Sequence, residues 1–411
     1  MKQNYLEEAE PSYTMTTVME EAARCLLCHD APCSAHCPAD TDPAKFIRSV
    51  RFRNFKGAAE TIRENNALGA VCARVCPTEK YCQLGCSRTQ IDRPIDIGGI
   101  QKFVTDFEND AQMTILEKGA ANGKKVAIVG SGPAGLQAAA TLLQKGFAVD
   151  LYEQNQKAGG YLRYGIPEYR LPNAIVDLEV KRIEALGAEF HYGITIGKDL
   201  ALAELKKLYD AVLLDIGMSE AKTLPMFENN PNVETAVSFL ARAKESGGNI
   251  EVPENVVVVG GGDVAMDVDT TLKLLGAKNV TDVVYEEFSE FKASEKELAG
   301  ARAAGITIID GYIPVKVSGN QVTFTHRHIA SELTITADKI ILAIGQKPVA
   351  ENLDLPLAHD EAAFAGYQSP DKQLFVAGDI AQGDKTVVWA VKKGKEAAEE
   401  IAEMLGGSSN D

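Results

Sequence analysis

The chain has 411 residues, a hydrophobic fraction of 45% and a formal net charge of −16. This length predicts about two to four folded domains, and no run of about 18 apolar residues predicts a transmembrane helix. The acidic charge argues against nucleic acid or an anionic membrane surface as a partner.

The first 25 residues are polar and acidic and contain no apolar segment of the kind found in signal peptides. We therefore expect a cytoplasmic protein.

The eight cysteines all lie between Cys25 and Cys86. They form two runs, C-x2-C-x4-C-x3-C-P and C-x3-C-P-x4-C-x3-C, made by Cys25, Cys28, Cys33 and Cys37 and then by Cys72, Cys76, Cys82 and Cys86. Closely spaced thiolates with a following proline are typical of iron–sulfur ligands. Eight such residues suffice for two clusters.

Three other interpretations of the cysteines are weaker. Cys25-x-x-Cys28-His29 matches a covalent haem attachment pattern, but that chemistry needs export from the cytosol. Two structural zinc sites could be built from eight cysteines, although the prolines after Cys37 and Cys76 favour clusters. A disulfide framework would require an oxidising compartment, for which the sequence has no signal.

A small basic group follows the first cysteine run. It comprises Arg48, Arg51, Arg53 and Lys56. We expect a solvated helix face there, with a docking patch as the alternative.

A helical pattern continues over 100–107, and the stretch KGAANGKK at 118–125 predicts a linker. The apolar strand 126–129 then leads into a G-x-G-x-x-G turn formed by Gly130, Gly132 and Gly135, a helix to Gln144, and a second strand that ends at Glu153. This is the dinucleotide-binding fingerprint: glycines allow the turn, the approach of the pyrophosphate and close helix packing, and the acid can accept ribose hydroxyls.

The fingerprint recurs about 130 residues later. Strand 256–259 precedes Gly260, Gly262, Asp263 and Ala265, and a helix to Leu275 and a strand over 280–285 lead to Glu286 and Glu287. The alanine at the third position is compatible with the pattern. Two fingerprints predict two bound dinucleotides.

A third segment is expected to contain a strand over 338–345 and another over 374–379 that ends at Asp379, followed by a helix over 386–401. This part resembles flavoprotein reductases that bind two dinucleotides. The resemblance implies that the first fingerprint binds FAD, with Asp379 on the ribityl chain, and that the second binds a nicotinamide nucleotide.

The motifs CLLCHDAPCSAHCP, LGAVCARVCPTEKYCQLGC, DIGGIQKF, GGYLRYGIPEYRLP and GGGDVAMD make the whole chain similar to the family that contains the glutamate synthase small subunit and the N-terminal half of dihydropyrimidine dehydrogenase. The stretch RNFKGAAETIRENNALGAVCARVCPTEK favours the dihydropyrimidine dehydrogenase branch. The implied fold is α/β, with an α-helical iron–sulfur domain (1–115) before two Rossmann-like domains. The FAD domain (123–250 and 345–411) is interrupted by the NAD domain (251–344).

The resemblance also implies a ligand scheme for two 4Fe-4S clusters. Because the fourth cysteine of such a run commonly serves the other cluster, one cluster takes Cys25, Cys28, Cys33 and Cys86. The second takes Cys37, Cys76, Cys82 and Gln101. Cys72 is left over, so an all-cysteine second cluster with Cys72 stays open. The flavin contacts carried over include Gly160 and Leu162, for which a plain glycine turn before a helix is the alternative.

The expected activity is oxidation of NADH, with electrons leaving through FAD and the clusters. Glu286 and Glu287 predict NADH over NADPH, because a carboxylate accepts the ribose hydroxyl and repels a phosphate. The sequence has no cysteine beside the nucleotide motifs and no segment for an FMN-binding barrel. An FMN-containing, PreA-like partner subunit is therefore expected to reduce uracil or thymine, and no catalytic acid or base is assigned because the cofactors perform the chemistry. A glutamate synthase small subunit, another NAD(P)H:acceptor reductase, and a redox sensor without enzymatic activity are the alternatives.

Overall fold

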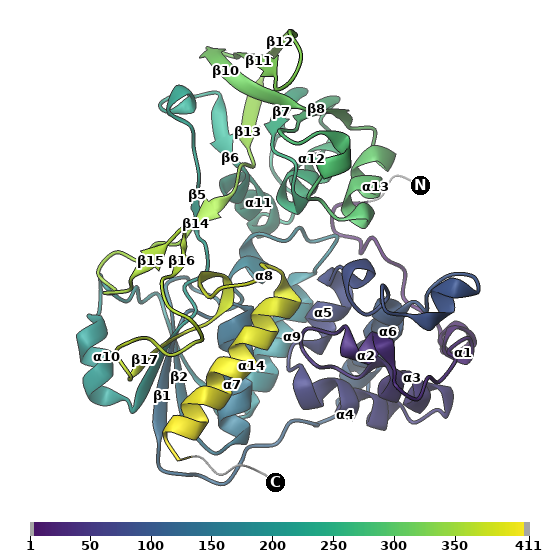
Figure 1. Ribbon diagram of the computed structural model, residues 1–411, viewed down its shortest axis with the longest axis vertical. Coiled ribbons are helices and arrows are strands. Elements are labelled where there is room, and N and C mark those ends of the chain that lie inside the picture. Colours follow the sequence, from purple (N-terminus) through teal and green to yellow (C-terminus); the bar gives the residue numbers. More distant parts are fainter. Residues whose placement is uncertain (1–3, 407–411) are drawn as a thin grey trace. The chain divides into compact units, whose positions relative to one another are not determined.

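The computed structural model describes residues 4–406 and divides into two compact units. The large unit contains residues 10–162, 173–217 and 348–406, and the small unit contains residues 4–9, 163–172 and 218–347. Each unit is built around a five-stranded parallel sheet, as the ribbon in Figure 1 shows.

The large unit begins with six short helices that carry the cysteines. They are α1 (Met15–Ala23), α2 (Pro32–Ala35), α3 (Pro43–Arg51), α4 (Phe55–Asn65), α5 (Gly69–Val75) and α6 (Ile97–Asp110), with 3-10 turns η1 (Thr78–Lys80) and η2 (Ser87–Gln90). Side chains of Asp42, Asn54 and Asp96 cap α3, α4 and α6 by accepting backbone N–H bonds. Phe46, Ile62 and other apolar residues of this region form one core, on which Cys82 packs.

The first sheet has the strand order β17-β4-β1-β2-β3. Its strands are β1 (Lys125–Val129), β2 (Ala148–Glu153), β3 (Glu189–Tyr192), β4 (Ala211–Leu214) and β17 (Leu374–Val376). The helices are α7 (Pro133–Gln144), α8 (Tyr161–Tyr164), α9 (Asn173–Ala185), α10 (Leu202–Leu208) and α14 (Val387–Met404), with the 3-10 turn η5 (Gly378–Ile380) and the small pair β15 (Leu357–Ala358) and β16 (Glu361–Ala362). This order is that of a dinucleotide-binding half of a Rossmann fold.

Helices α7 and α14 lie side by side on this sheet (Figure 1). Gly394 permits the close approach, because a Cβ there would lie 2.2 Å from the carbonyl oxygen of Ala134. The N-terminus of α14 therefore lies near the first glycine turn, which immediately precedes α7.

The second sheet, in the small unit, has the order β6-β13-β7-β8-β9. Its strands are β6 (Val233–Thr235), β7 (Asn255–Val259), β8 (Asn279–Val283), β9 (Thr307–Ile309) and β13 (Lys339–Leu342). The helices are α11 (Ala236–Glu245), α12 (Asp263–Leu275) and α13 (Glu295–Ala303), with η3 (Pro225–Phe227) and η4 (Phe288–Glu290). An antiparallel sheet of β10 (Tyr312–Ser318), β11 (Gln321–His326) and β12 (Glu332–Thr336) is added, and β5 (Glu220–Ala221) pairs with β14 (Gln346–Lys347).

Several segments of the small unit lie outside the boundaries expected for the second nucleotide domain, 251–344, and the longest of them is 218–250. Strand β6, which precedes residue 251, pairs with β13 at the edge of the second sheet. No glycine motif in the sequence marks this edge strand. Residues 163–172 also pack in the small unit, where Arg170 forms ion pairs with Asp267 and Glu297. Long-range ion pairs of this kind leave no local mark in the sequence.

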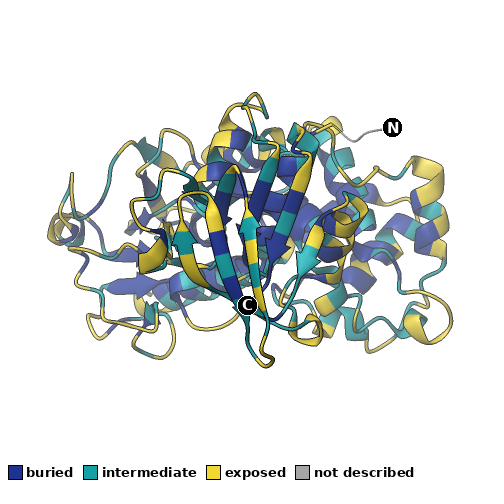
Figure 2. Cartoon of the chain, turned by 90° about the horizontal axis from the view of Figure 1, so that it is seen from above, coloured by how far each residue is buried: buried dark blue, intermediate teal, exposed yellow. Residues whose placement is uncertain are grey.

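Buried residues concentrate on the sheet strands and on the inward faces of the helices, whereas the connecting loops carry most exposed positions (Figure 2). Among residues 4–406, no helix combines the length and the apolar character that crossing a bilayer requires.

Candidate cluster and dinucleotide sites

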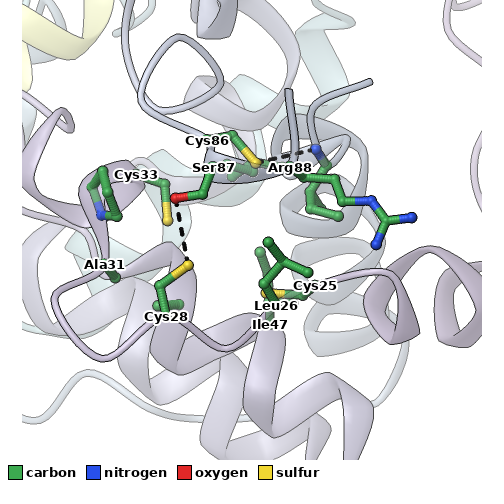
Figure 3. Close-up of a pocket in the computed structure, with 13 residues that line it drawn as sticks. Cys25, Leu26, Cys28, Ala31, Cys33, Ile47, Cys86, Ser87 and Arg88 are labelled. Atoms are coloured by element: carbon green, nitrogen blue, oxygen red, sulfur yellow. Dashed lines mark hydrogen bonds between the residues drawn. The ribbon is translucent and has the colours of Figure 1, made fainter. Parts of the chain in front are cut away.

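Four cysteines expected to share one cluster line a single cavity in the large unit. Cys25, Cys28, Cys33 and Cys86 surround it together with Leu26, Ser87 and Arg88 (Figure 3). They come from the loop after α1, from α2 and from the residue before η2, so the fold joins segments about 60 residues apart in sequence. The cavity contains no competing acidic or histidine side chain among its lining residues.

One polar contact of these thiols suits a bound cluster, whose thiolates accept hydrogen bonds: the Ile95 N–H donates to Cys86 Sγ at 3.5 Å. In the protonated form, Cys28 Sγ donates to the Ser87 hydroxyl at 3.6 Å. Burial, together with the nearby Cys25 and Cys86 thiols, raises the pKa of Cys33 to about 11. Thiolates this close together require a compensating positive charge, which cluster iron supplies.

The remaining four cysteines form a second group that is more deeply buried. Burial raises the pKa of the Cys76 thiol well above its ordinary value, and the neighbouring Cys72, Cys82 and Cys37 thiols raise it further. Burial is likewise the main reason that the pKa of Cys72 is raised to about 12, and the Cys37 thiol contributes to the shift. The fold therefore places Cys72 in the second group, so the all-cysteine alternative stays open.

Gln101 is also close to this region. It lies on α6, which packs against α5, the helix that carries Cys72. Its side chain is buried and its Nε2 donates to the carbonyl oxygen of Gly69 at 2.8 Å. That bond orients the amide, and the ligand role of Gln101 remains a prediction.

The first glycine turn is tightly enclosed by its own chain. Gly130 has φ of +100°, and a Cβ there would lie 2.0 Å from the Asp215 carbonyl oxygen. A Cβ at Gly135 would lie 2.4 Å from the Gly130 carbonyl oxygen. At Gly160, with φ of +51°, it would lie 2.9 Å from the Cα of Gly132. Each of these three positions therefore excludes a side chain for a steric reason.

Glu153 lies at the end of β2, as expected, and is almost fully buried. One of its oxygens accepts bonds from the N–H and hydroxyl of Ser131, and the other accepts two bonds from Asn155. This carboxylate is therefore held rigidly at the strand end, where a fingerprint acid meets ribose. Leu162, two residues after Gly160, is buried.

Sequence reasoning missed Asp215 and Lys393. Asp215 follows β4 and accepts the Gly135 N–H at 2.6 Å. Burial raises its pKa well above the ordinary range, and Asp379 and Glu153 add to the shift. Lys393, on α14, donates to the carbonyl oxygens of Gly378, Ala381 and Asp384 and so holds the loop that carries Asp379. The position of Lys393 in the apolar stripe of its helix was the available signal.

The second glycine turn is more open. A Cβ at Gly262 would meet nothing within 4 Å, so there is free space at the start of α12, where N–H groups can bind a pyrophosphate. Asp263 is the first residue of that helix and accepts the Ser294 N–H at 2.7 Å. Ala265 is fully buried, as close packing of helix and strand requires.

Glu286 lies at this second turn. Its Oε2 would be 3.2 Å from a Cβ at Gly261, and its Oε1 pairs with Lys292 Nζ at 2.6 Å. Strand β8 ends at Val283, two residues earlier than expected, so Glu286 lies on the following loop. Lys292 is a cation that the sequence reasoning did not place beside the ribose position.

One further contact joins the second cysteine group to the nucleotide-binding part of the large unit. The Tyr81 hydroxyl donates to Asp384 Oδ2 at 2.7 Å and lies 3.3 Å from Thr386 Oγ1. Tyr81 immediately precedes Cys82, and Thr386 caps α14. The cluster region and the first glycine turn therefore belong to one packed body.

Comparisons with known proteins agree with both modules. Residues 2–113 match a family model described as dihydropyrimidine dehydrogenase domain II, 4Fe-4S cluster, and residues 124–394 match the pyridine nucleotide-disulphide oxidoreductase family. The NAD-dependent dihydropyrimidine dehydrogenase subunit PreT of Escherichia coli O157:H7 is 55% identical over 99% of both chains. A glutamate synthase (NADPH) small chain from Halomonas elongata is 30% identical, over 98% of this chain and 93% of its own.

Among solved structures, FprA from Mycobacterium tuberculosis (His57Gln mutant) is similar with a TM-score of 0.59 and 18% identity, covering 69% of this chain and 85% of its own. At that identity the likeness supports the fold, which is the expected α/β arrangement of two dinucleotide-binding domains. The chain is an oxidoreductase and belongs to the family that contains the NAD-dependent dihydropyrimidine dehydrogenase subunit PreT.

Proposed function

We propose that the chain oxidises NADH and delivers the electrons, through FAD and two 4Fe-4S clusters, to a PreA-like FMN-containing subunit that reduces uracil or thymine at carbons 5 and 6. The couple can run in either direction in the cell. The observation that carries this proposal is the joining of both cysteine groups and the first glycine turn in one compact unit, with Tyr81 bonded to the segment before α14. Electron carriers held by one rigid body keep a constant separation.

The residues assigned to the nucleotides bind and orient them. We assign to FAD Gly130, Gly132, Gly135, Glu153, Gly160, Leu162 and Asp379, with Asp215 and Lys393 as positioning residues. We assign to NAD(H) Gly260, Gly262, Asp263, Ala265 and Glu286. FAD held by these residues would supply hydride-accepting and one-electron chemistry, so no side-chain acid or base is required. The chain's part is to hold and orient the two nucleotides.

The clusters are assigned to the two cysteine groups. The first takes Cys25, Cys28, Cys33 and Cys86, which line one cavity. The second takes Cys37, Cys76, Cys82 and Gln101, with Cys72 as the alternative fourth ligand. Anaerobically purified protein should contain about eight iron atoms and eight acid-labile sulfides per chain, as two cubane clusters require. Zinc in place of iron would refute both assignments.

Two matched variants decide the fourth ligand. Gln101→Ala should alter the electron paramagnetic resonance spectrum of one cluster, whereas Cys72→Ser should leave both clusters assembled. Loss of a cluster in Cys72→Ser, with an unchanged Gln101→Ala protein, would establish the all-cysteine cluster instead.

The experiment that tests the proposed function compares two acceptors. With NADH alone the chain should reduce ferricyanide but not uracil, and dihydrouracil should form only after a PreA-like subunit is added. Cys25→Ser should abolish dihydrouracil formation and spare much of the ferricyanide reduction, because a small dye can take electrons at the flavin. Uracil reduction by the chain alone would contradict the proposal.

The glutamate synthase small chains supply a second candidate, since one of them is 30% identical over nearly the whole chain. Activity with a glutamate synthase large subunit, and none with the PreA-like subunit, would favour it. We place either complex in the cytoplasm.

A further inference from the structure

The two ends of the cluster region differ in how they are covered. The second cysteine group is connected to the nucleotide-binding part of the large unit through Tyr81, which bonds Asp384 and Thr386. Nearby, the fully buried Arg63 binds the carboxylates of Glu108 and Glu179, on α6 and α9. These contacts fix the cluster helices against the first sheet's helices. Of the two cysteine groups, the second is therefore the one that adjoins the assigned FAD site.

The first cysteine group lies at an exposed surface. Its cavity is lined by Leu26, which sits between two of the cysteines and keeps 46% of its surface exposed (Figure 3). Phe52, directly after α3, is 72% exposed. Arg51 Nη1 donates to the Cys25 carbonyl oxygen at 3.3 Å, which ties the turn at Phe52 to the cysteine loop. On the segment around Cys86, Leu84 and Ile91 are also exposed, by 65% and 63%.

The same surface carries several arginines. Arg48 and Arg53 are exposed beside Phe52, and Arg88 lines the cavity, where it pairs with Asp92 at 2.8 Å. Arg48 precedes Phe52 by four residues, so both project from one face of the C-terminal turn of α3. The whole chain carries a net charge of −16, so this basic group stands out from an acidic background. Large apolar side chains flanked by arginines are the composition of protein interfaces.

We propose that the surface formed by Leu26, Arg48, Phe52, Arg53 and Arg88, which we call the exit patch, is the docking surface for the electron-accepting FMN-containing subunit. This inference rests on the proposed function. The partner's matching surface should have an apolar centre, an acidic rim and a redox centre behind it, because charge complementarity steers association. Redox complexes commonly use small interfaces, below about 1,200 Å². A few exposed side chains can therefore provide the binding energy.

The test replaces Phe52 by glutamate and measures the dissociation constant of a purified PreA-like subunit. Phe52→Glu should weaken binding at least about tenfold, as truncation of an interface anchor typically does. Leu208→Glu is the matched control: Leu208 is 66% exposed on α10 of the same unit and lies outside the patch. Both variants should retain ferricyanide reduction and an unchanged melting temperature, which shows that the fold and the flavin are intact.

A second variant tests the charges. Replacing Arg48 and Arg53 together by glutamate should slow association with the PreA-like subunit and reduce its dependence on salt, because exposed charges act mainly on the association rate. Hydrogen exchange on the wild-type complex should show protection of residues 24–29 and 48–53.

The outcomes are distinguishable. If the wild-type chain binds the PreA-like subunit and Phe52→Glu binds it equally well, or if residues 24–29 and 48–53 gain no protection, the exit patch is wrong and the proposed function stands. If the wild-type chain does not bind the PreA-like subunit, both the proposed partner and the role of the exit patch are refuted.

Discussion

The two glycine turns have nearly the same sequence pattern but different surroundings. The first glycine of each turn is enclosed, because a Cβ would lie 2.0 Å from a backbone oxygen at Gly130 and 2.4 Å from one at Gly260. The turns differ at the next glycine of the motif: a Cβ on Gly132 would lie 2.9 Å from Asp215 Oδ2, whereas a Cβ on Gly262 would meet nothing within 4 Å. At this position the first turn is closed by other parts of its own chain, and the second keeps open space.

This difference suits the two nucleotides assigned to the turns. FAD stays bound through many turnovers, so an enclosed cradle that the chain itself completes is an advantage. A nicotinamide nucleotide must enter and leave in each cycle, which requires open space. The same glycine motif therefore suits a different nucleotide at each turn, depending on the residues that surround it.

The largest expected effect comes from placing a methyl group at each turn. Gly132→Ala should lower the FAD content, because the methyl group would lie 2.9 Å from the Asp215 carboxylate, at the position where the pyrophosphate approaches the backbone. Gly262→Ala should fold normally and change only the KM for NADH. FAD content and melting temperature measure both effects, and equal FAD content in the two variants would erase the proposed contrast.

Glu286 and Glu287, which follow β8, allow the nucleotide preference of the second turn to be tested at the position expected to bind ribose. Wild-type protein should prefer NADH over NADPH roughly ten- to 150-fold, which corresponds to a charged hydrogen bond of about 1.5–3 kcal/mol. Replacing Glu286 and Glu287 by arginine should reverse the preference, since Lys292 then becomes a third cation for the 2′-phosphate. Steady-state specificity constants for both nucleotides test this.

Lys292→Ala is the control for the same prediction. Without Lys292, Glu286 loses its ion-pair partner and should repel the phosphate more strongly, so the NADH preference should increase. An NADPH preference in wild type would show that Lys292 outweighs Glu286.

Replacing the buried Lys393 should affect the first glycine turn and leave the second glycine turn unchanged. Lys393→Met loses three bonds to the loop around Asp379 and should lower the free energy of unfolding by about 1–3 kcal/mol, the cost of unsatisfied buried polar groups, and weaken FAD retention. The neighbouring Lys392→Met removes an ion pair with Glu396 and should have little effect. Denaturant unfolding and FAD release measure both variants, and an unchanged Lys393→Met protein would exclude a role in holding the loop.

The smallest expected effect is a pH-dependent gain in the free energy of unfolding when a buried aspartate of the second nucleotide domain is replaced. Asp269 on α12 and Asp282 on β8 are fully buried next to each other, and burial raises the pKa of both well above the ordinary range. A raised folded-state pKa means that the stability contribution of these carboxyls is present below the unfolded pKa, about 4, and is lost as pH rises through the folded pKa.

Asp282→Asn removes that titration. The variant should therefore be more stable than wild type at pH 8, and the difference should disappear near pH 4. Free energies of unfolding at the two pH values check the sign, and a gain confined to pH 4 would contradict it.

Local spacing was enough to locate the cysteine runs, both glycine turns, and Glu153 at a strand end, because each depends on residues close together in sequence. The strands and helices around both turns were predicted to within a few residues for the same reason. Asp379 was expected at a strand end but lies on η5, because β17 already ends at Val376. Cys25, Cys28, Cys33 and Cys86, grouped by resemblance, line one cavity in the fold.

Contacts between distant segments were decided only by the tertiary structure. Asp215 lies 80 residues from its partner Gly135, and Tyr81 lies 303 residues from Asp384. Cys37 joins Cys72 and Cys76 in the second thiol group although it lies about 35 residues before α5, and Arg170 carries residues 163–172 into the small unit through ion pairs about 100 residues away. A single sequence contains no periodic or compositional signal for such pairings. They form only when helices and strands pack together, because buried polar groups on one element then bond to groups on another.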